Sequence, residues 1–249
     1  MTLTALVRRG TLALLAAGLL SAGACAYHHY ASPLVPAPLD IPGAVLAEDG
    51  AVEYSQPGLL LRLRALSDQQ LNRQFATHSE AGPASTNPFT FADTRFLRSP
   101  HQRQRFTVFH VELRNHEYRK IKLDPVQTRL EAPDGRQYWA LTLDQLDSYY
   151  RAYLQGHQGN EYLRYQQRLD LARSALYKNE EVFPGDASEG LLVFPVLAPH
   201  IGQVTLHLSD LVLRFDPRGE PVESLALTFP FVRDVGRAYE DGRVDLADR

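Results

Sequence analysis

The stretch FTVFHVELRNHEYRKIKLDPVQTRLEAPDGRQYWAL, residues 106–141, decides the fold. Its first part, 107–113, places an apolar or β-branched residue at every second position, with His110 and Glu112 among the residues between them. Alternation with a period of two is typical of a strand that buries one face in an antiparallel sheet. Further along the stretch, Asp134-Gly135 is the kind of dipeptide that joins two such strands in a tight turn.

The same alternation appears at 61–65, 204–208 and 225–231, and turn residues separate these segments. Two of the turns are Pro184-Gly185-Asp186 and Asp216-Pro217-Arg218-Gly219. Several short strands joined by Gly, Pro and Asp turns favour a sandwich of two antiparallel sheets. We therefore expect a mainly β, immunoglobulin-like antiparallel β-sandwich over residues 51–232.

Helical spacing interrupts the strand pattern after residue 141. Thr142 and Gln145 form a plausible capping box, and apolar residues follow at helical spacing up to Gly156. After Gly159-Asn160, a second apolar stripe begins at Tyr165. We expect an α-helical hairpin at about 143–178, inserted between two strands.

The sequence pattern is less regular in the N-terminal half of the predicted sandwich, at 67–105. Ser67 with Gln70 predicts a short helix. The polar stretch 78–105 predicts a long loop that carries a short strand at Phe89-Thr90-Phe91.

Two blocks of sequence carry a family resemblance. The quoted stretch contains a strand that ends in an Asn turn and then a DG-x-x-Y hairpin, and about 40 residues later comes EEVFPGDASEGLLVFPV, residues 180–196. Together they resemble an immunoglobulin-like family of unknown function that is common in bacterial lipoproteins. The resemblance implies a fold and an extracytoplasmic location, but no chemistry. The helical hairpin between the blocks departs from the family pattern.

The N-terminus predicts export. Residues 1–24 contain Arg8-Arg9, an apolar run and then small residues, which is the layout of a bacterial signal peptide. The only cysteine, Cys25, follows Ala22-Gly23-Ala24 and is the expected lipidation site of a lipoprotein. Ala22 stands where lipoprotein signals usually carry leucine, so ordinary cleavage and secretion is the alternative. Because Ala26 follows the cysteine, we expect the outer membrane, with the protein facing the periplasm.

Two segments outside the sandwich have their own composition. Four prolines fall between residues 25 and 50, which predicts an extended tether from the lipidated cysteine. Residues 233–249 are charged and poor in apolar side chains, which predicts a flexible polar tail.

Charge and cysteine content exclude several classes. The formal charge of −3 becomes about −5 when residues 1–24, with Arg8 and Arg9, are removed, and an acidic chain does not suit nucleic acid. With one cysteine, no intramolecular disulfide is possible. At 44% apolar residues, the chain can build a core and stabilise itself by packing.

No catalytic, cofactor or metal motif emerges, so we expect neither an enzyme nor a bound cofactor or metal. The loop 185–190 has the wrong spacing for a nucleophile elbow. His28-His29 lacks further ligands nearby. Asp144 and Asp147 could bind a cation together, but carboxylates near a helix N-terminus are better explained by the helix dipole.

Tyrosine is the one unusual feature. Half of the tyrosines lie in the helical insertion, and five form the candidate interaction surface: Tyr149, Tyr150, Tyr153, Tyr162 and Tyr165. Tyrosine suits protein interfaces and sugar stacking. The simpler interpretation is that these rings pack the hairpin onto the sheet. Trp139 is expected in the core.

These observations predict a lipid-anchored interaction or accessory module of the cell envelope. Its expected partners are the membrane, through the anchor, and another envelope protein, bound through the tyrosine-rich hairpin. The alternative is a module that binds a glycan or peptidoglycan through the same tyrosines.

Overall fold

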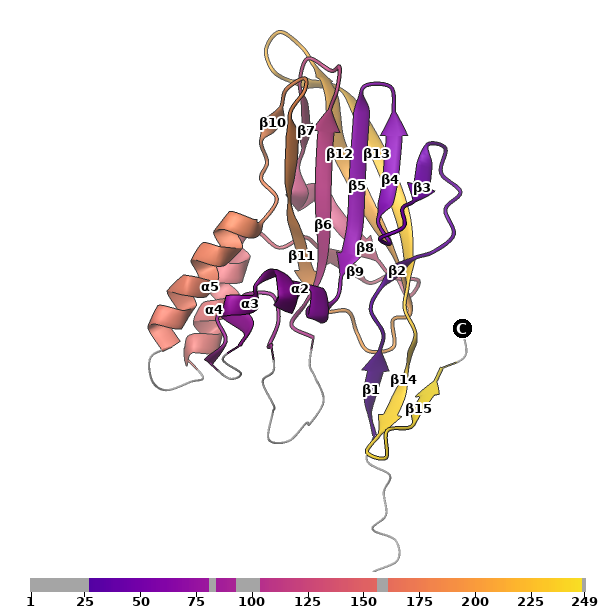
Figure 1. Ribbon diagram of the computed structural model, residues 1–249. Helices are drawn as coiled ribbons and strands as arrows, with labels where there is room; N and C mark the ends of the chain where they lie inside the picture. The colour runs from indigo at the N-terminus through magenta and orange to yellow at the C-terminus, as the bar shows by residue number, and fades with distance from the viewer. Residues whose placement is uncertain (1–26, 81–83, 93–103, 156–160, 248–249) are drawn as a thin grey trace, which may run out of the picture.

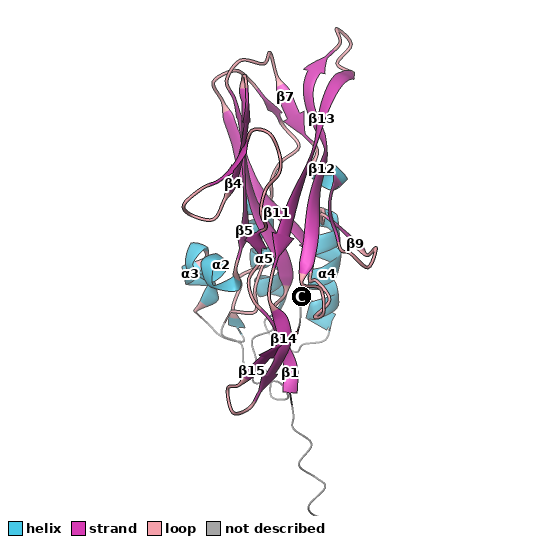
Figure 2. Cartoon of the chain, turned by 90° about the vertical axis from the view of Figure 1, so that its right-hand side faces the viewer, coloured by secondary structure: helices cyan, strands magenta, loops and turns pink. Residues whose placement is uncertain are grey.

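Two antiparallel sheets packed face to face form the body of the protein, as the computed structural model shows (Figures 1 and 2). The structure describes residues 27–80, 84–92, 104–155 and 161–247. The predicted antiparallel β-sandwich with an inserted helical hairpin is confirmed.

One sheet has five strands and the other has seven. The five-stranded sheet has the order β11 (Ala187–Pro195), β6 (Phe106–Asn115), β5 (Leu59–Leu66), β4 (Val52–Gln56) and β3 (Ala44–Leu46). The seven-stranded sheet has the order β10 (Glu181–Val182), β7 (Ile121–Leu123), β12 (Gln203–Phe215), β13 (Pro221–Val232) and β2 (Val35–Pro36). Its two remaining strands are β8 (Thr128–Glu131), which pairs with β12, and β9 (Gln137–Trp139), which pairs with β8. Asp134-Gly135 joins β8 to β9, and Gly135 has the positive φ of 83° that favours glycine in this turn.

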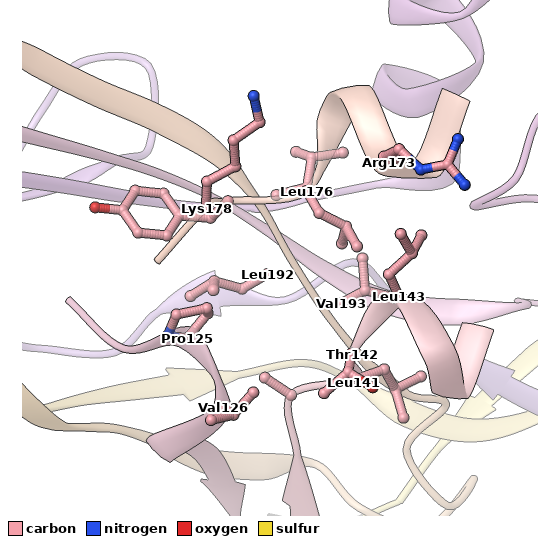
Figure 3. A pocket seen from close by; sticks show the side chains of 13 residues that line it. Pro125, Val126, Leu141, Thr142, Leu143, Arg173, Leu176, Lys178, Leu192 and Val193 are labelled. Atoms are coloured by element: carbon pink, nitrogen blue, oxygen red, sulfur yellow. The ribbon is translucent and has the colours of Figure 1, made fainter. Parts of the chain in front are cut away.

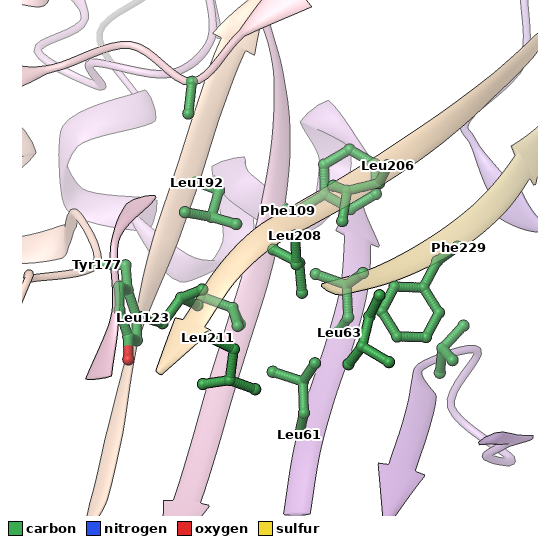
Figure 4. Packing of buried hydrophobic residues seen from close by; sticks show 14 of the residues in the cluster. Leu61, Leu63, Phe109, Leu123, Tyr177, Leu192, Leu206, Leu208, Leu211 and Phe229 are labelled. Atoms are coloured by element: carbon green, nitrogen blue, oxygen red, sulfur yellow. The ribbon is translucent and has the colours of Figure 1, made fainter. Parts of the chain in front are cut away.

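The main core lies between the two sheets (Figure 4). Alternate residues of the predicted strands supply it, including Leu61, Leu63, Phe109, Leu206 and Phe229. These side chains are almost completely buried. The period-two pattern therefore identified the inward faces correctly.

A second core lies on the outer face of the five-stranded sheet. Helices cover one end of that face: α2 (Asp68–Gln74), α3 (Ala76–Ser79), α4 (Leu143–Gln155) and α5 (Glu161–Ala175). Val108 of β6 and Leu191 and Val193 of β11 point into this second core. Strands buried on both faces lose the alternation, which explains the continuous apolar run 191–194.

The predicted tether over residues 25–50 is wrong for its described part, 27–50. β1 (Tyr27–Ala31), β2 and β3 each pair with a later or neighbouring strand. The prolines hold this segment extended, and extended backbone can pair at sheet edges. Apolar residues between the prolines, Leu34, Leu39 and Ile41, pack against the main core.

The predicted flexible tail at 233–249 is also wrong over its described part, 233–247. β14 (Val235–Tyr239) pairs with β1 and with β15 (Val244–Leu246), forming a small third sheet below the sandwich (Figure 1). A Cβ on Gly236 would lie 2.1 Å from the carbonyl oxygen of Asp245, so this close pairing needs glycine. The turn residues Asp241-Gly242 were the missed hairpin signal.

The predicted strand at Phe89-Thr90-Phe91 is not formed. Phe89 is instead completely buried in the second core, where it contacts Phe75 with a ring-centroid distance of 5.3 Å. The Asn87 side chain accepts a 2.9 Å hydrogen bond from the Phe89 backbone N–H and so shapes the segment locally. A side-chain contact of this kind competes with strand pairing.

Candidate functional site

The helical insertion is attached to the sandwich at both of its ends. The backbone N–H of Leu141 donates to the carbonyl of Val193 at 2.7 Å, and that of Tyr177 donates to the carbonyl of Leu191 at 3.0 Å. Both acceptors lie on the edge of β11, two residues apart. The insertion therefore leaves and rejoins the sandwich at nearly the same point.

The predicted capping box begins the first helix of the insertion. The Thr142 hydroxyl accepts a hydrogen bond from the Gln145 backbone N–H at 3.2 Å, and the Gln145 side chain accepts one from the Thr142 N–H at 2.8 Å. These contacts satisfy N–H groups that the helix itself leaves unpaired. The Ser67–Gln70 box at α2 is present as well.

Polar contacts hold the two helices together. The Tyr165 hydroxyl donates to Asp147, and Arg151 forms a 2.9 Å ion pair with the same carboxylate. These two partners lower the pKa of Asp147. Asp144 lies in the first turn of α4, where its negative charge interacts favourably with the positive end of the helix dipole. No group of three or more metal-ligating side chains occurs among the described residues.

A buried arginine of α5, paired with a glutamate of the same helix, attaches α5 to residues 84–92. Arg168 lies 3.4 Å from Glu161 and donates a 2.6 Å hydrogen bond to the carbonyl of Ser85. Both charged side chains are buried. The insertion is therefore packed against residues 84–92 as well as against β11.

Burial divides the five tyrosines of the predicted interaction surface. Tyr150 and Tyr165 are buried, and Tyr149 is half-buried against the second core. The Tyr153 side chain lies outside the described residues. Tyr162 alone among the described members is well exposed, at 61%. The five-residue surface is therefore not formed as predicted, because packing the hairpin onto the sheet uses most of these rings.

A cavity of about 320 Å³ lies at the root of the insertion, beside its two attachment points (Figure 3). Four segments line it: Pro125 and Val126 from the short helix η2 (Pro125–Gln127), residues 140–143, the end of α5 with residues 176–178, and Leu191, Leu192 and Val193 of β11. The lining is mainly aliphatic. Arg173 and Lys178 are its two charged residues, and no lining residue is acidic.

Tyr177 lines this cavity and also belongs to the main core. Burial raises the pKa of Tyr177 to about 12, so the phenol is neutral at physiological pH. The sequence gives no local sign of the cavity, because its walls are far apart along the chain. The continuous apolar run at β11 was the nearest signal.

Trp139 lies on the outer face of the seven-stranded sheet and is 46% exposed, so its predicted core position is wrong. In β9 the side chain of Tyr138 points inward instead. The Arg129 guanidinium carbon lies 5.6 Å from the Trp139 ring centroid. Glu131 lies 3.5 Å from both Arg129 and His207, which completes a polar cluster beside the indole.

His110 and His207 lie on the outward faces of their strands, as predicted, and are partly covered. Burial lowers the pKa of each imidazole, and this effect is partly opposed by Glu189 near His110 and by Glu131 near His207.

His28 and His29 are adjacent residues of β1 and pair with Ala238 and Arg237 of β14. Cys25 and the predicted signal peptide, residues 1–24, lie outside the described residues.

In the part of the chain that the structure describes, no helix is long and apolar enough to span a membrane.

The comparisons with known proteins give one structural similarity. No protein-family model and no curated protein matches the chain. Among solved structures, the secreted protein MPT63 from Mycobacterium tuberculosis is similar with 10% identity and a TM-score of 0.29, covering 63% of this chain and 83% of MPT63.

Proposed function

We propose that this chain is a lipid-anchored module of the bacterial cell envelope that binds another envelope protein and has no catalytic role. The observation that carries the proposal is a pair of exposed apolar side chains on α5. Tyr162 and Leu163 are adjacent and are 61% and 58% exposed. An exposed aromatic and an exposed aliphatic side chain next to each other, on an element that stands out from the sandwich, support a protein-binding surface here (Figure 1).

The anchor rests on the N-terminal sequence. A signal-peptide layout over residues 1–24 and the single cysteine at position 25 support export followed by lipidation. The outer membrane facing the periplasm is the proposed location. A Cys25→Ala variant should leave the detergent phase in a partition experiment, whereas persistence there would contradict lipidation.

Site-specific crosslinking tests the binding surface. A photoreactive residue at Leu163 should capture a defined envelope protein in cells, and Tyr162→Ala should reduce that capture about tenfold or more. The matched control is a photoreactive residue at Val222, which is exposed on β13. Equal capture from both positions, or capture unaffected by Tyr162→Ala, would contradict the proposal.

Binding of a glycan or peptidoglycan is the second candidate, and the exposure of Trp139 favours it. An indole flanked by Arg129, Glu131 and His207 combines a stacking face with hydrogen-bonding groups, which suits a sugar ring. This location differs from the predicted one, because Tyr150 and Tyr165 are buried.

Fluorescence tests this candidate directly, because Trp139 is the only tryptophan. Soluble peptidoglycan fragments should shift or quench its emission in a saturable manner, and Arg129→Gln should weaken the response. Unchanged emission at saturating fragment concentrations would exclude the Trp139 face as the sugar site.

A further inference from the structure

The cavity at the root of the insertion is bounded by fixed backbone. Leu141 and Tyr177 are hydrogen-bonded to β11 through Val193 and Leu191. Leu192 lies between these two acceptors and lines the cavity. Leu192 also belongs to the main core and is only 1% exposed, so the cavity reaches the edge of the space between the two sheets.

The chemistry of the lining favours an alkyl chain. Aliphatic side chains from opposite walls, including Leu176, Leu192 and Val126, surround the space in Figure 3. Water needs two to four polar partners to be held well, and such a lining offers few. A volume of about 320 Å³ lies at the lower end of the range for small-molecule pockets.

The charge of the lining favours an anionic head group. In Figure 3, Arg173 near the end of α5 and Lys178 just after it lie on either side of Leu176, and their charged ends point away from Leu192 and Val126. Both residues are exposed, so their charges lie at the rim of the cavity. Arg173 forms an exposed 2.7 Å ion pair with Asp170, which is weak in water and open to exchange. Lys178 is exposed, at the side of the cavity opposite to Arg173 in Figure 3. An incoming carboxylate would therefore meet two cations and no acidic lining residue.

We propose that this cavity binds a single-chain amphiphile, with its alkyl chain between Leu192 and Val126 and its anionic head group against Lys178 and Arg173. A fatty acid is the simplest compound of this class. The inference is independent of the protein-binding surface proposed above, since Tyr162 and Leu163 are not part of the cavity lining.

Calorimetric titration of the purified full chain with laurate, kept below its micelle concentration, tests the proposal. We expect one saturable site, and titration should shift the methyl resonances of Leu192 and Val126. Val126→Trp replaces a wall residue, itself 40% exposed, with a large ring that competes for the alkyl position, and should reduce laurate affinity about tenfold or more. Val222→Trp is the control, because Val222 is exposed on β13, and it should bind laurate normally.

The head group is tested with a neutral analogue. The double variant Lys178→Gln/Arg173→Gln should lose about tenfold in laurate affinity, which is typical of losing a charge-assisted contact, while dodecanol binding stays unchanged. The charge-conserving double variant Lys178→Arg/Arg173→Lys should bind laurate about as tightly as the natural chain.

Three results would overturn the inference or a part of it. No saturable laurate binding to the natural chain would exclude the site, and equal binding to the Val126→Trp variant would place the ligand elsewhere. Equal loss of laurate and dodecanol in the charge variant would overturn the head-group assignment. Circular dichroism of each variant confirms that the fold is retained.

Discussion

Tyr177 donates its backbone N–H to the carbonyl oxygen of Leu191 at 3.0 Å, and this bond joins the end of the helical insertion to the edge strand of the sandwich. The neighbouring residue on β11 is Gly190. A Cβ on Gly190 would lie 2.5 Å from both the N and the Cα of Tyr177. The absence of a side chain at position 190 is therefore what allows the insertion to approach the strand.

Gly190→Ala should destabilise the protein. The added methyl group meets backbone rather than a flexible side chain, so residues 176–178 must move away from β11. Overpacking of this kind costs about 1–3 kcal/mol, measurable by denaturant unfolding. Gly202→Ala is the control, because its nearest contact would be at 3.3 Å and the cost should be smaller. Equal effects of the two changes would contradict this account.

Tyr150→Phe should destabilise the protein more than Tyr162→Phe does, because Tyr150 is buried and Tyr162 is exposed. The Tyr150 hydroxyl donates a 2.8 Å hydrogen bond to the carbonyl of Pro88, and the residue is only 1% exposed. Removing this bond should lower the free energy of unfolding by about 1 kcal/mol. Tyr162→Phe should change it by less than about 0.5 kcal/mol, as expected for a surface position. A larger loss for Tyr162→Phe would reverse the assignment.

Arg168→Leu should be strongly destabilising. The change leaves the buried Glu161 with one arginine partner fewer and removes the donor to the carbonyl of Ser85. Removing one member of a buried ion pair costs about 3–5 kcal/mol. Arg173→Leu is the matched control on the same helix, because its pair with Asp170 is exposed and contributes at most about 1 kcal/mol. The measurement is thermal unfolding of both variants. A similar loss of stability in Arg168→Leu and Arg173→Leu would contradict the burial of the Arg168–Glu161 pair.

Asp68→Asn should alter the pH dependence of stability. Burial raises the pKa of Asp68 to about 6, while the Arg105 charge nearby acts in the opposite direction. Because the folded pKa is above the unfolded value of 3.8, the folded state holds its proton more tightly. The stabilisation from this group is complete below about pH 4 and is lost as the pH rises through 6.

The measurement for Asp68 is the difference in unfolding free energy between variant and natural protein. With Asn at position 68, this contribution disappears, so the difference should shift in favour of the variant by about 2 kcal/mol between pH 4 and pH 7. A difference that stays constant across this range would show that Asp68 has an ordinary pKa in the folded protein.

The strands of the sandwich were predictable because their signals are local. In β5, β6, β12 and β13, side chains at i and i+2 share a face, so a half-buried strand shows its period directly in the sequence. The capping boxes at Ser67 and Thr142 depend on residues three positions apart. The two helices of the insertion followed from the same short-range spacing.

The candidate site was predicted only in part. The insertion lies where its helical spacing placed it, but Tyr150 and Tyr165 turned inward while Trp139 turned outward. An aromatic ring satisfies either a core or a surface position, so its residue type does not decide between them. The alternative stated for the tyrosines, that they pack the hairpin onto the sheet, describes most of the rings.

The amino-acid sequence by itself determined the β-sandwich, its turns and the helical insertion, because each depends on neighbours within a few residues. Only the tertiary structure decided which segments meet: β1 with β14, the second core on the five-stranded sheet, and the four-walled cavity beside Leu192. Those contacts join residues far apart in the chain, so no local period encodes them. These long-range contacts form because they let the strands and helices bury their apolar faces against one another.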